Sequence, residues 1–325
     1  MTSYISAFRP VFLVLLMIAA IEASLALASV PEPYIGGLYS HQYLSGDVPQ
    51  KRFVNEKIRL FKHTDAEFIQ VGDSSGLNGV QPYVVERTLG SHHPYINGNC
   101  CGDTGYAGYR YLAETFLRHA PRAKYLVFYT TPLCVPSLGR EGLSRSLYRA
   151  LISPFRFVEA LPSLHYRIAI TNLVYYGTYS HLMFDNMLSS EVIKRFSESK
   201  GWYPAPASPK REVVPTDECD FDPSYNAPDN PTLKPELEKL KAVADKYHVK
   251  LILLFNPVAC TAGPKIKPLV DDLNDFLQHH PDVIMPLPYI TTINSDAFAN
   301  AMHLSEEASV GNSERVGKAL ARVTH

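Results

Sequence analysis

Two short segments far apart in the sequence carry the residue types of a serine nucleophile and its base. In the first, Gly72-Asp73-Ser74 follows an apolar run, and in the second, His303 comes just before a helical pattern. Each segment on its own also fits a capping turn or a surface loop. A serine attacks an acyl carbon when a neighbouring base removes its proton, and histidine suits this task near neutral pH. We therefore predict Ser74 as the nucleophile and His303 as its base.

Backbone N–H groups near Ser74 are candidates for binding the oxyanion of an acyl-transfer reaction. Ser74 itself comes where a strand turns into a helix, so its N–H is one candidate donor. Gly102 opens the next predicted helix and is the second. Asn256 ends the most apolar strand pattern and is a third, although a turn residue before Pro257 is the simpler interpretation.

An alternation of strand and helix patterns must position these residues. Such alternation predicts a parallel sheet with helices on both faces and a site at the carboxyl ends of the strands. We expect a flavodoxin-like three-layer α/β/α domain over residues 31–325, with a helical insertion at about 135–230. Strands are predicted over residues 67–71, 95–97, 125–129, 249–255 and 283–285, and helices over 106–119, 235–247, 267–279 and 305–322.

The insertion is rich in aromatic residues, which can bind the faces of sugar rings. At helical spacing, aromatic side chains more often belong to a core, so we expect most of them to be buried. Trp202 is the candidate for lining a groove near Ser74. The set comprises Tyr148, Phe155, Phe157, Tyr166, Tyr175, Tyr176, Tyr179, Trp202 and Tyr203.

The N-terminus predicts export. Residues 10–30 are almost wholly apolar, Arg9 precedes them, and no Lys or Arg follows until Lys51. This charge asymmetry keeps the N-terminus inside and sends the body across the membrane. The segment fits an uncleaved signal anchor, because about 20 apolar residues span a bilayer, and it also fits a signal peptide cleaved after Ala28. We expect a periplasmic or otherwise extracytoplasmic body, anchored in the inner membrane if the segment is retained.

Charge and cysteine content narrow the class of ligand. The net charge is −1, with 31 basic and 32 acidic residues, so nucleic acid is not an expected partner. No spacing typical of a metal site occurs among the five cysteines, and we expect neither a metal nor another cofactor. Cys219 and Cys260 both lie in loop-like sequence and are the first choice for a disulfide.

The order of the segments resembles the SGNH/GDSL hydrolase superfamily. G-D-S follows the first predicted strand, G-D-T follows the second, and a histidine precedes the last helix. Ser74 matches the serine of the family's first block, Gly102 the glycine of the second, and His303 the histidine of the fifth. The membrane segment and Met302-His303-Leu304-Ser305 resemble the exported SGNH-like proteins of polysaccharide O-acetylation, the alginate acetylation proteins among them.

This resemblance implies an exported O-acetyltransferase or acetylesterase that works through an acyl-Ser74 intermediate. The expected substrate is a carbohydrate polymer or acetylated sugar, and a membrane-bound acyltransferase is the candidate partner. Hydrolase and transferase would use the same residues, so the sequence leaves this choice open.

Two positions depart from the family pattern. The family has Asp three residues before the histidine, where this chain has Asn300, and the third block's Asn is replaced at Thr131. Asn300 can still orient His303, with Asp296 as the alternative orienting residue. The departures also fit a catalytically weak or inactive SGNH-like scaffold that binds a polysaccharide or a membrane acyltransferase.

Overall fold

The computed structural model describes residues 10–14, 16–17, 57, 59–62, 64–90, 92–99, 105–132, 190–205, 214, 216–219, 233–300 and 302–324. The chain divides into two compact units, one made of Met1–Asn55 and Ser146–Glu191 and the other of Glu56–Arg145 and Val192–His325. Nearly all described residues belong to the second unit.

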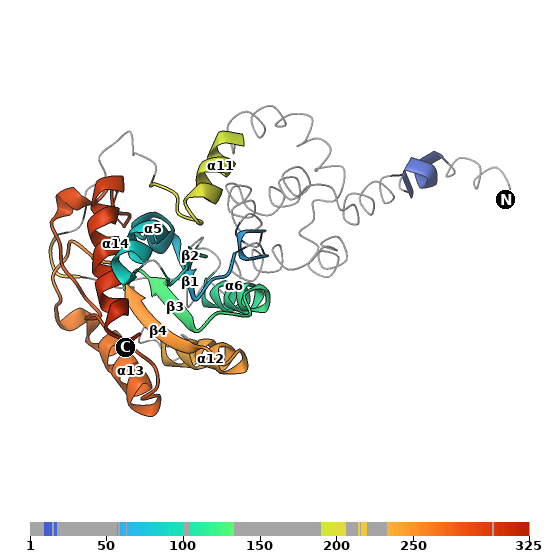
Figure 1. The fold of residues 1–325 in the computed structure, drawn as a ribbon. Helices are drawn as coiled ribbons and strands as arrows, with labels where there is room; N and C mark the ends of the chain where they lie inside the picture. Colours follow the sequence, from blue (N-terminus) through green and yellow to red (C-terminus); the bar gives the residue numbers. More distant parts are fainter. Residues whose placement is uncertain are drawn as a thin grey trace. The chain divides into compact units, whose positions relative to one another are not determined.

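Parallel strands form the centre of this unit (Figure 1). Their residues are buried almost throughout, as expected for a parallel sheet covered on both faces. The predicted α/β class and parallel sheet are therefore confirmed. The order across the sheet is β2 (Tyr95–Asn97), β1 (Phe68–Gly72), β3 (Tyr125–Thr130) and β4 (Lys250–Phe255).

The strand predicted over residues 283–285 is present only as a single bridge beside β4. Ile284 makes one isolated parallel bridge to Ile252 of β4, in which the Ile284 N–H donates to the Leu251 carbonyl at 3.0 Å. Pro286 and Pro288 follow at once. Because proline has no N–H to donate, the ladder cannot continue.

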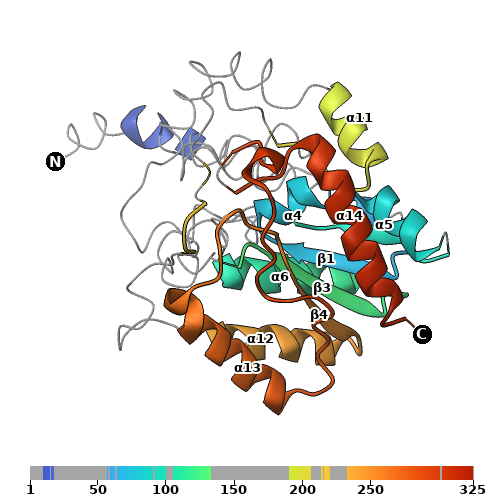
Figure 2. The same cartoon turned by 90° about the vertical axis from the view of Figure 1, so that its left-hand side faces the viewer.

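Helices cover both faces of the sheet (Figures 1 and 2). On one face α14 (Glu306–Ala321) packs against α4 (Ser74–Gly79) and α5 (Pro82–Leu89). On the other, α6 (Gly105–His119) packs on β1, and α12 (Leu233–Lys246) packs on β4 and α6. The described part thus has three layers. The outlying helices are α13 (Lys267–His279), which packs on α12, together with α11 (Ser190–Glu198), η4 (Pro264–Ile266) and η5 (Ser295–Ala297).

Alternate strand residues supply the two core layers. Val127 and Ile252 face α14, where they join Leu320 in one buried cluster. Phe128 points to the opposite face and contacts Tyr109 of α6 with ring centroids 5.9 Å apart. A fully buried side chain of this size contributes roughly 1.5–3 kcal/mol to folding. The sheet is thus fixed from both sides, which gives its carboxyl edge a rigid base.

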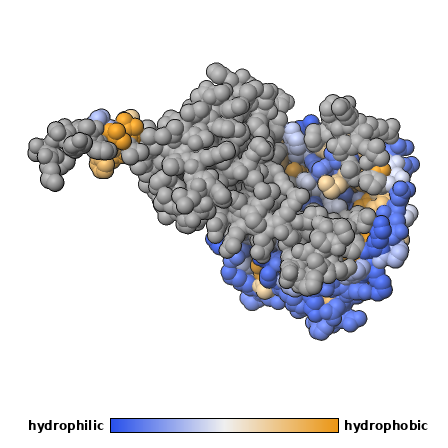
Figure 3. All heavy atoms as spheres, turned by 180° about the vertical axis from the view of Figure 1, so that it is seen from behind, coloured by the Kyte–Doolittle hydropathy of each residue, from blue (hydrophilic) through white to orange (hydrophobic). Residues whose placement is uncertain are grey.

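Two predicted segments lie largely outside the described residues. Of the export segment, residues 10–14 and 16–17 are helical, and their large apolar side chains are half exposed or more. Figure 3 shows them as orange atoms. Among the described ranges, no helix is long and apolar enough to cross a membrane. Within the predicted insertion, residues 190–205, 214 and 216–219 are described, and α11 is helical.

Candidate active site

Ser74 is positioned by the sharp turn from β1 into α4. Gly72 has φ +148°, and a Cβ there would lie 1.8 Å from the carbonyl oxygen of Tyr129, so only glycine fits. Asp73 is the N-cap of α4, and its carboxylate accepts the Ser75 N–H at 2.9 Å. Ser74 is therefore the first residue of α4, at the carboxyl end of a central strand.

The Asp73 carboxylate is buried, and each of its oxygens accepts two hydrogen bonds. One oxygen accepts the N–H and the hydroxyl of Ser75. The other accepts the Thr130 hydroxyl at 2.7 Å and the Thr131 N–H at 2.9 Å. Four donors offset the cost of burying this charge. The end of β3, where the resembled family has its third-block Asn, here anchors Asp73 instead.

The side chain of Asn99 also holds this turn, by hydrogen bonds to backbone carbonyls. Its Nδ2 donates to the carbonyls of Asp73 at 3.0 Å and Tyr129 at 2.7 Å, and its Oδ1 accepts from Gln70 at 2.8 Å. Gly76 makes room for this amide, because a Cβ at Gly76 would lie 2.0 Å from Asn99 Nδ2. A glycine is therefore required on either side of Ser74.

His303 is carried by a tight loop between η5 and α14. An antiparallel bridge between Phe298 and Leu304 closes the loop, and the Ala299 N–H donates to the His303 carbonyl at 2.8 Å. The side chain of Ser305 caps α14 directly afterwards, as its sequence before two glutamates suggests. The loop thus has a defined backbone on both sides of the histidine.

The structure brings together three of the residues proposed from the sequence. Ser74 Oγ lies 2.8 Å from His303 Nε2. His303 Nδ1 lies 2.8 Å from Asn300 Oδ1. Nucleophile, base and orienting group of a serine site follow one another in this way.

The hydrogen bonds around Asn300 determine the tautomer of His303. Asn300 Oδ1 also accepts the backbone N–H of Met302 at 3.2 Å and of His303 at 3.0 Å. Because a backbone N–H can only donate, this atom is the amide oxygen. The neutral His303 ring must therefore carry its proton on Nδ1, which leaves Nε2 as an acceptor facing the Ser74 hydroxyl.

The structure answers the prediction for Asp296, the alternative orienting residue, but not the one for Gly102, the second oxyanion candidate. Asp296 is an exposed residue of η5 whose N–H donates to Asn294 Oδ1 at 3.1 Å. The place next to His303 Nδ1 is occupied by Asn300. Gly102 lies outside the described residues, so its oxyanion role stays a prediction.

Asn256 is not a free oxyanion donor. Its Nδ2 donates to the carbonyls of Pro257 at 2.9 Å and Met302 at 3.2 Å, and its Oδ1 accepts the Tyr129 hydroxyl at 3.1 Å. The side chain is buried and its amide hydrogens are committed to the protein. Its position at the end of the most apolar strand made Asn256 a candidate site residue. Nothing in the sequence indicated that it would donate to the carbonyl of Met302, the residue before His303.

Trp202 is buried and does not line a groove, so the prediction that its ring contacts a sugar near Ser74 is wrong. The indole is buried, with 6% exposed, and its N–H donates to the Asn78 carbonyl at 2.8 Å. The Tyr203 N–H donates to the Leu77 carbonyl at 3.2 Å. These bonds fasten the segment after α11 to the helix that begins with Ser74. The predicted aromatics from 148 to 179 lie outside the described residues.

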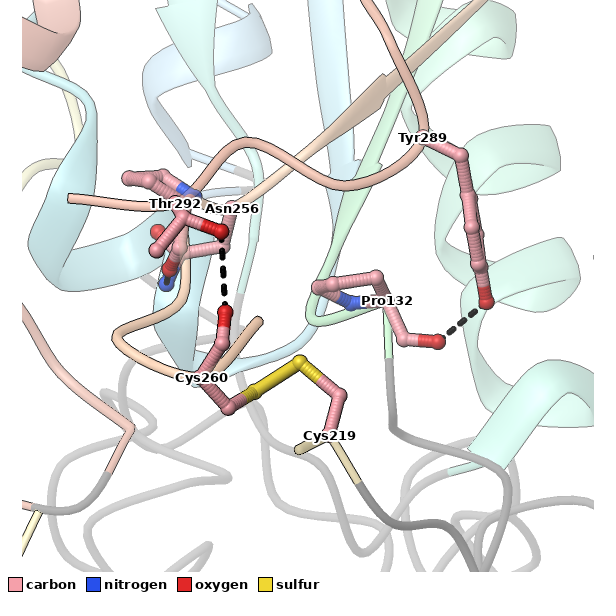
Figure 4. The surroundings of a disulfide bond; sticks show 7 residues. Pro132, Cys219, Asn256, Cys260, Tyr289 and Thr292 are labelled. Carbon is pink, nitrogen blue, oxygen red and sulfur yellow. Dashed lines mark hydrogen bonds between the residues drawn. A yellow bond between two sulfur atoms is a disulfide. The ribbon is translucent and has the colours of Figure 1, made fainter. Parts of the chain in front are cut away.

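The predicted disulfide between Cys219 and Cys260 is present (Figure 4). Beside it, the Cys219 N–H donates to the Thr261 carbonyl at 2.8 Å, and the Thr292 hydroxyl donates to the Cys260 carbonyl at 2.9 Å. The bridge thereby joins residues 217–219 to the segment after β4. That segment pairs in turn with the stretch leading to η5 and the His303 loop.

The chain matches no protein-family model, and no curated protein is significantly similar to it. Over the part of the chain that the structure describes, no group of three or more His, Cys, Asp or Glu side chains could hold a metal ion. The site itself holds a hydroxyl, an imidazole and an amide in hydrogen-bonded series, an arrangement suited to attack on a carbonyl carbon.

Proposed function

We propose that this protein is a serine-dependent acyl-ester enzyme that forms an acyl-Ser74 intermediate. The observation that supports it most directly is the series Asn300, His303, Ser74, with 2.8 Å on both sides of the imidazole and the ring proton on Nδ1. A histidine in this tautomer is ready to accept the serine proton without first rearranging.

The first half-reaction breaks the ester of the donor. As Ser74 Oγ bonds to the acyl carbon, His303 Nε2 takes the hydroxyl proton, and Asn300 keeps the imidazolium oriented. The Ser74 N–H belongs to the first turn of α4, where helices leave N–H groups without intrahelical partners, so it is available to the oxyanion. Collapse of the tetrahedral intermediate expels the donor's alcohol oxygen, which receives the proton from His303.

The second half-reaction reverses these roles. His303 removes a proton from the acceptor hydroxyl, and the acceptor oxygen attacks the acyl carbon. The bond from the acyl carbon to Ser74 Oγ then breaks, and His303 returns the proton to Oγ. A sugar hydroxyl as acceptor gives an O-acetyltransferase, and water gives an acetylesterase. We propose a polysaccharide or acetylated sugar as the substrate class.

The topology supports an SGNH-like, flavodoxin-like domain. The strand order β2-β1-β3-β4, with the Ile284 bridge beyond β4, follows the flavodoxin-like order 2-1-3-4-5. Ser74 follows the first strand and His303 precedes the closing helix, as in the resembled superfamily.

Two observations support a location outside the cytoplasm. The helical residues between 10 and 17 expose Val11, Phe12, Leu13, Val14, Leu16 and Met17, which suits contact with lipid. The Cys219–Cys260 disulfide fits an oxidising compartment. We propose that residues 10–30 hold the body at the outer face of the inner membrane, near a membrane-bound acyltransferase partner.

Labelling with a fluorophosphonate probe tests the proposal. The wild type should be labelled, Ser74→Ala should not, and His303→Ala should react at least about 100-fold more slowly, the usual size of a general-base contribution. Labelled protein would then be assayed for acetyl release and for acetyl transfer to an oligosaccharide. A folded wild type that resists the probe would refute the enzyme and favour the binding scaffold, for which the uncharged Asn300 is the supporting observation.

A further inference from the structure

A chain of buried hydrogen bonds runs from α14 to the loop that carries His303. Arg315 Nε and Nη2 donate to Asn312 Oδ1 at 3.2 and 2.9 Å, and Asn312 Nδ2 donates to the Tyr129 hydroxyl at 2.9 Å. Tyr129 donates to Asn256 Oδ1 at 3.1 Å, and Asn256 Nδ2 donates to the Met302 carbonyl at 3.2 Å. The three middle side chains are buried.

The direction of this chain is fixed. Arginine can only donate, so Asn312 must present its oxygen to Arg315 and its NH₂ to Tyr129. The Tyr129 hydroxyl then has its own proton left for Asn256. Burial raises the pKa of Tyr129 to about 12, so the phenol keeps this proton at ordinary pH. Hydrogen bonds that all point one way in a protein interior strengthen one another.

The last bond of the chain holds the peptide group that carries His303. The carbonyl of that peptide belongs to Met302 and accepts from Asn256. Its N–H belongs to His303 and donates to Asn300 at 3.0 Å. One peptide plane is therefore held at both edges, which fixes the starting point of the His303 side chain.

The same chain also holds the helix of the nucleophile. Besides the Tyr129 hydroxyl, Asn312 Nδ2 donates to the carbonyl of Gly79 at 2.7 Å. Gly79 is the last residue of α4, and Ser74 is the first. A Cβ at Gly79 would come within 3.1 Å of Asn256 Oδ1, so this glycine lets α4 approach the chain closely.

We propose that Asn312, Tyr129 and Asn256 are positioning residues that set the separation of Ser74 and His303. They do so by tying α4 and the His303 peptide to a single buried series of hydrogen bonds. This inference rests on the proposed function, since the separation matters only if the pair reacts. A displacement of about 1 Å can cost on the order of 100-fold in rate, so a small loosening should be measurable.

Two variants break the chain at different links. Tyr129→Phe removes the hydroxyl and adds no charge. Asn256→Asp keeps an acceptor for Tyr129 but cannot donate to Met302. Ile252→Ala is the matched control, because Ile252 is buried in β4, the strand that Asn256 directly follows, and lies outside the chain of hydrogen bonds. Fluorophosphonate labelling at saturating and limiting probe would separate probe binding from the inactivation rate constant, and circular dichroism would give the melting temperature.

Both chain variants should inactivate at least ten-fold more slowly per folded molecule, with probe binding unchanged. Ile252→Ala should lower the melting temperature and leave the rate constant as in the wild type. The positioning role is overturned if the chain variants keep the wild-type rate constant, or if Ile252→Ala lowers it as much as they do.

A second measurement needs no activity. The ¹⁵N spectrum of the His303 imidazole, assigned by comparison with His303→Ala, should show the Nδ1–H tautomer in the wild type and a mixture of tautomers in both chain variants. An unreactive wild type with these spectra would refute the proposed function but support the positioning. If the wild type is reactive and both Tyr129→Phe and Asn256→Asp keep the tautomer and the rate, the proposed function is supported and the positioning role is refuted.

Discussion

One side-chain oxygen of Asn300 accepts both the backbone N–H and the ring Nδ1–H of His303, at 3.0 and 2.8 Å. The amide therefore fixes the position and the tautomer of the histidine, which are two of the tasks of the acid in a serine triad. It does not supply the third, because a neutral amide stabilises the imidazolium less than a carboxylate does. His303 is thus held in one orientation and one tautomer, but no carboxylate charge stands beside its Nδ1.

Replacing Asn300 with Asp should supply this charge and raise the rate of Ser74 acylation by about one to two powers of ten, since exchanging a triad Asp for Asn costs about 10⁴ in a serine protease. The carboxylate can accept the same N–H groups. Fluorophosphonate labelling rates of the wild type and Asn300→Asp, compared at the same pH, measure this effect.

Asp296→Ala is the matched control for this prediction. Because Asn300 occupies the position beside His303 Nδ1, removal of the exposed Asp296 carboxylate should change the labelling rate less than about two-fold. A severe loss in Asp296→Ala, together with an unchanged rate in Asn300→Asp, would instead identify Asp296 as the orienting residue.

Two glycine-to-alanine substitutions should shift stability in opposite directions. At Gly76 the new Cβ would lie 2.0 Å from Asn99 Nδ2, so overpacking should cost about 3 kcal/mol of unfolding free energy. At Gly311 in α14 no heavy atom lies within 4 Å of the new Cβ, and better helix propensity should gain about 0.8 kcal/mol. Urea unfolding of both variants would measure this difference, and equal signs would contradict it.

Lys57 should make stability rise with pH. Its ammonium is buried, donates to the carbonyls of Asn97 and Gly201 at 2.8 and 3.0 Å, and has a pKa well below its usual value because of burial. The unfolded chain then binds this proton more tightly than the folded one. Between the lowered pKa and the usual value of about 10.5, unfolding free energy therefore increases as pH increases.

Comparison with Lys57→Met isolates this effect. The methionine cannot titrate, so the stability advantage of the wild type over Lys57→Met should grow as pH is raised from about 7 to 10. Urea unfolding at each pH gives the two free energies. An advantage that stays constant over this range would show that Lys57 binds its proton equally well in both states.

The disulfide should contribute about 4 kcal/mol, because Cys219 and Cys260 close a loop with a sequence separation of 41. The double variant Cys219→Ser with Cys260→Ser should unfold at correspondingly lower urea concentration. Dithiothreitol should therefore destabilise the wild type by about this amount more than it destabilises the double variant. Equal stability of oxidised and reduced wild type would rule out this contribution.

Local signals in the sequence were sufficient for the four strands of the sheet, for α6, α12, α13 and α14, and for the pairing of Ser74 with His303. The buried strands are apolar runs in the sequence because both faces of the sheet are covered. Ser305, followed by two glutamates, indicated the start of α14. Gly72-Asp73-Ser74 was recognisable because a strand-to-helix turn needs that glycine and gains from an Asp cap. Asn300 was identified by its spacing from His303.

Contacts between distant residues were beyond the sequence. Tyr129 pairs with Asn256 and Asn312, which lie 127 and 183 positions away, and nothing in the strand pattern marks its hydroxyl as the middle of a chain. Trp202 was misassigned because an aromatic on a sugar-binding face and one buried on a helix have the same local pattern. The segment predicted as a strand over residues 283–285 pairs with β4 only at Ile284, because the two prolines that follow cannot donate to the ladder.

Ser74 and His303 are 229 positions apart, so the time at which each is synthesised also matters. At about 5–20 residues per second, a ribosome needs roughly 10 to 45 seconds after making Ser74 to reach His303. Through that interval the nascent chain contains Ser74 but not His303. Under the proposed mechanism, a chain released before residue 303 therefore keeps the nucleophile and lacks the base that activates it.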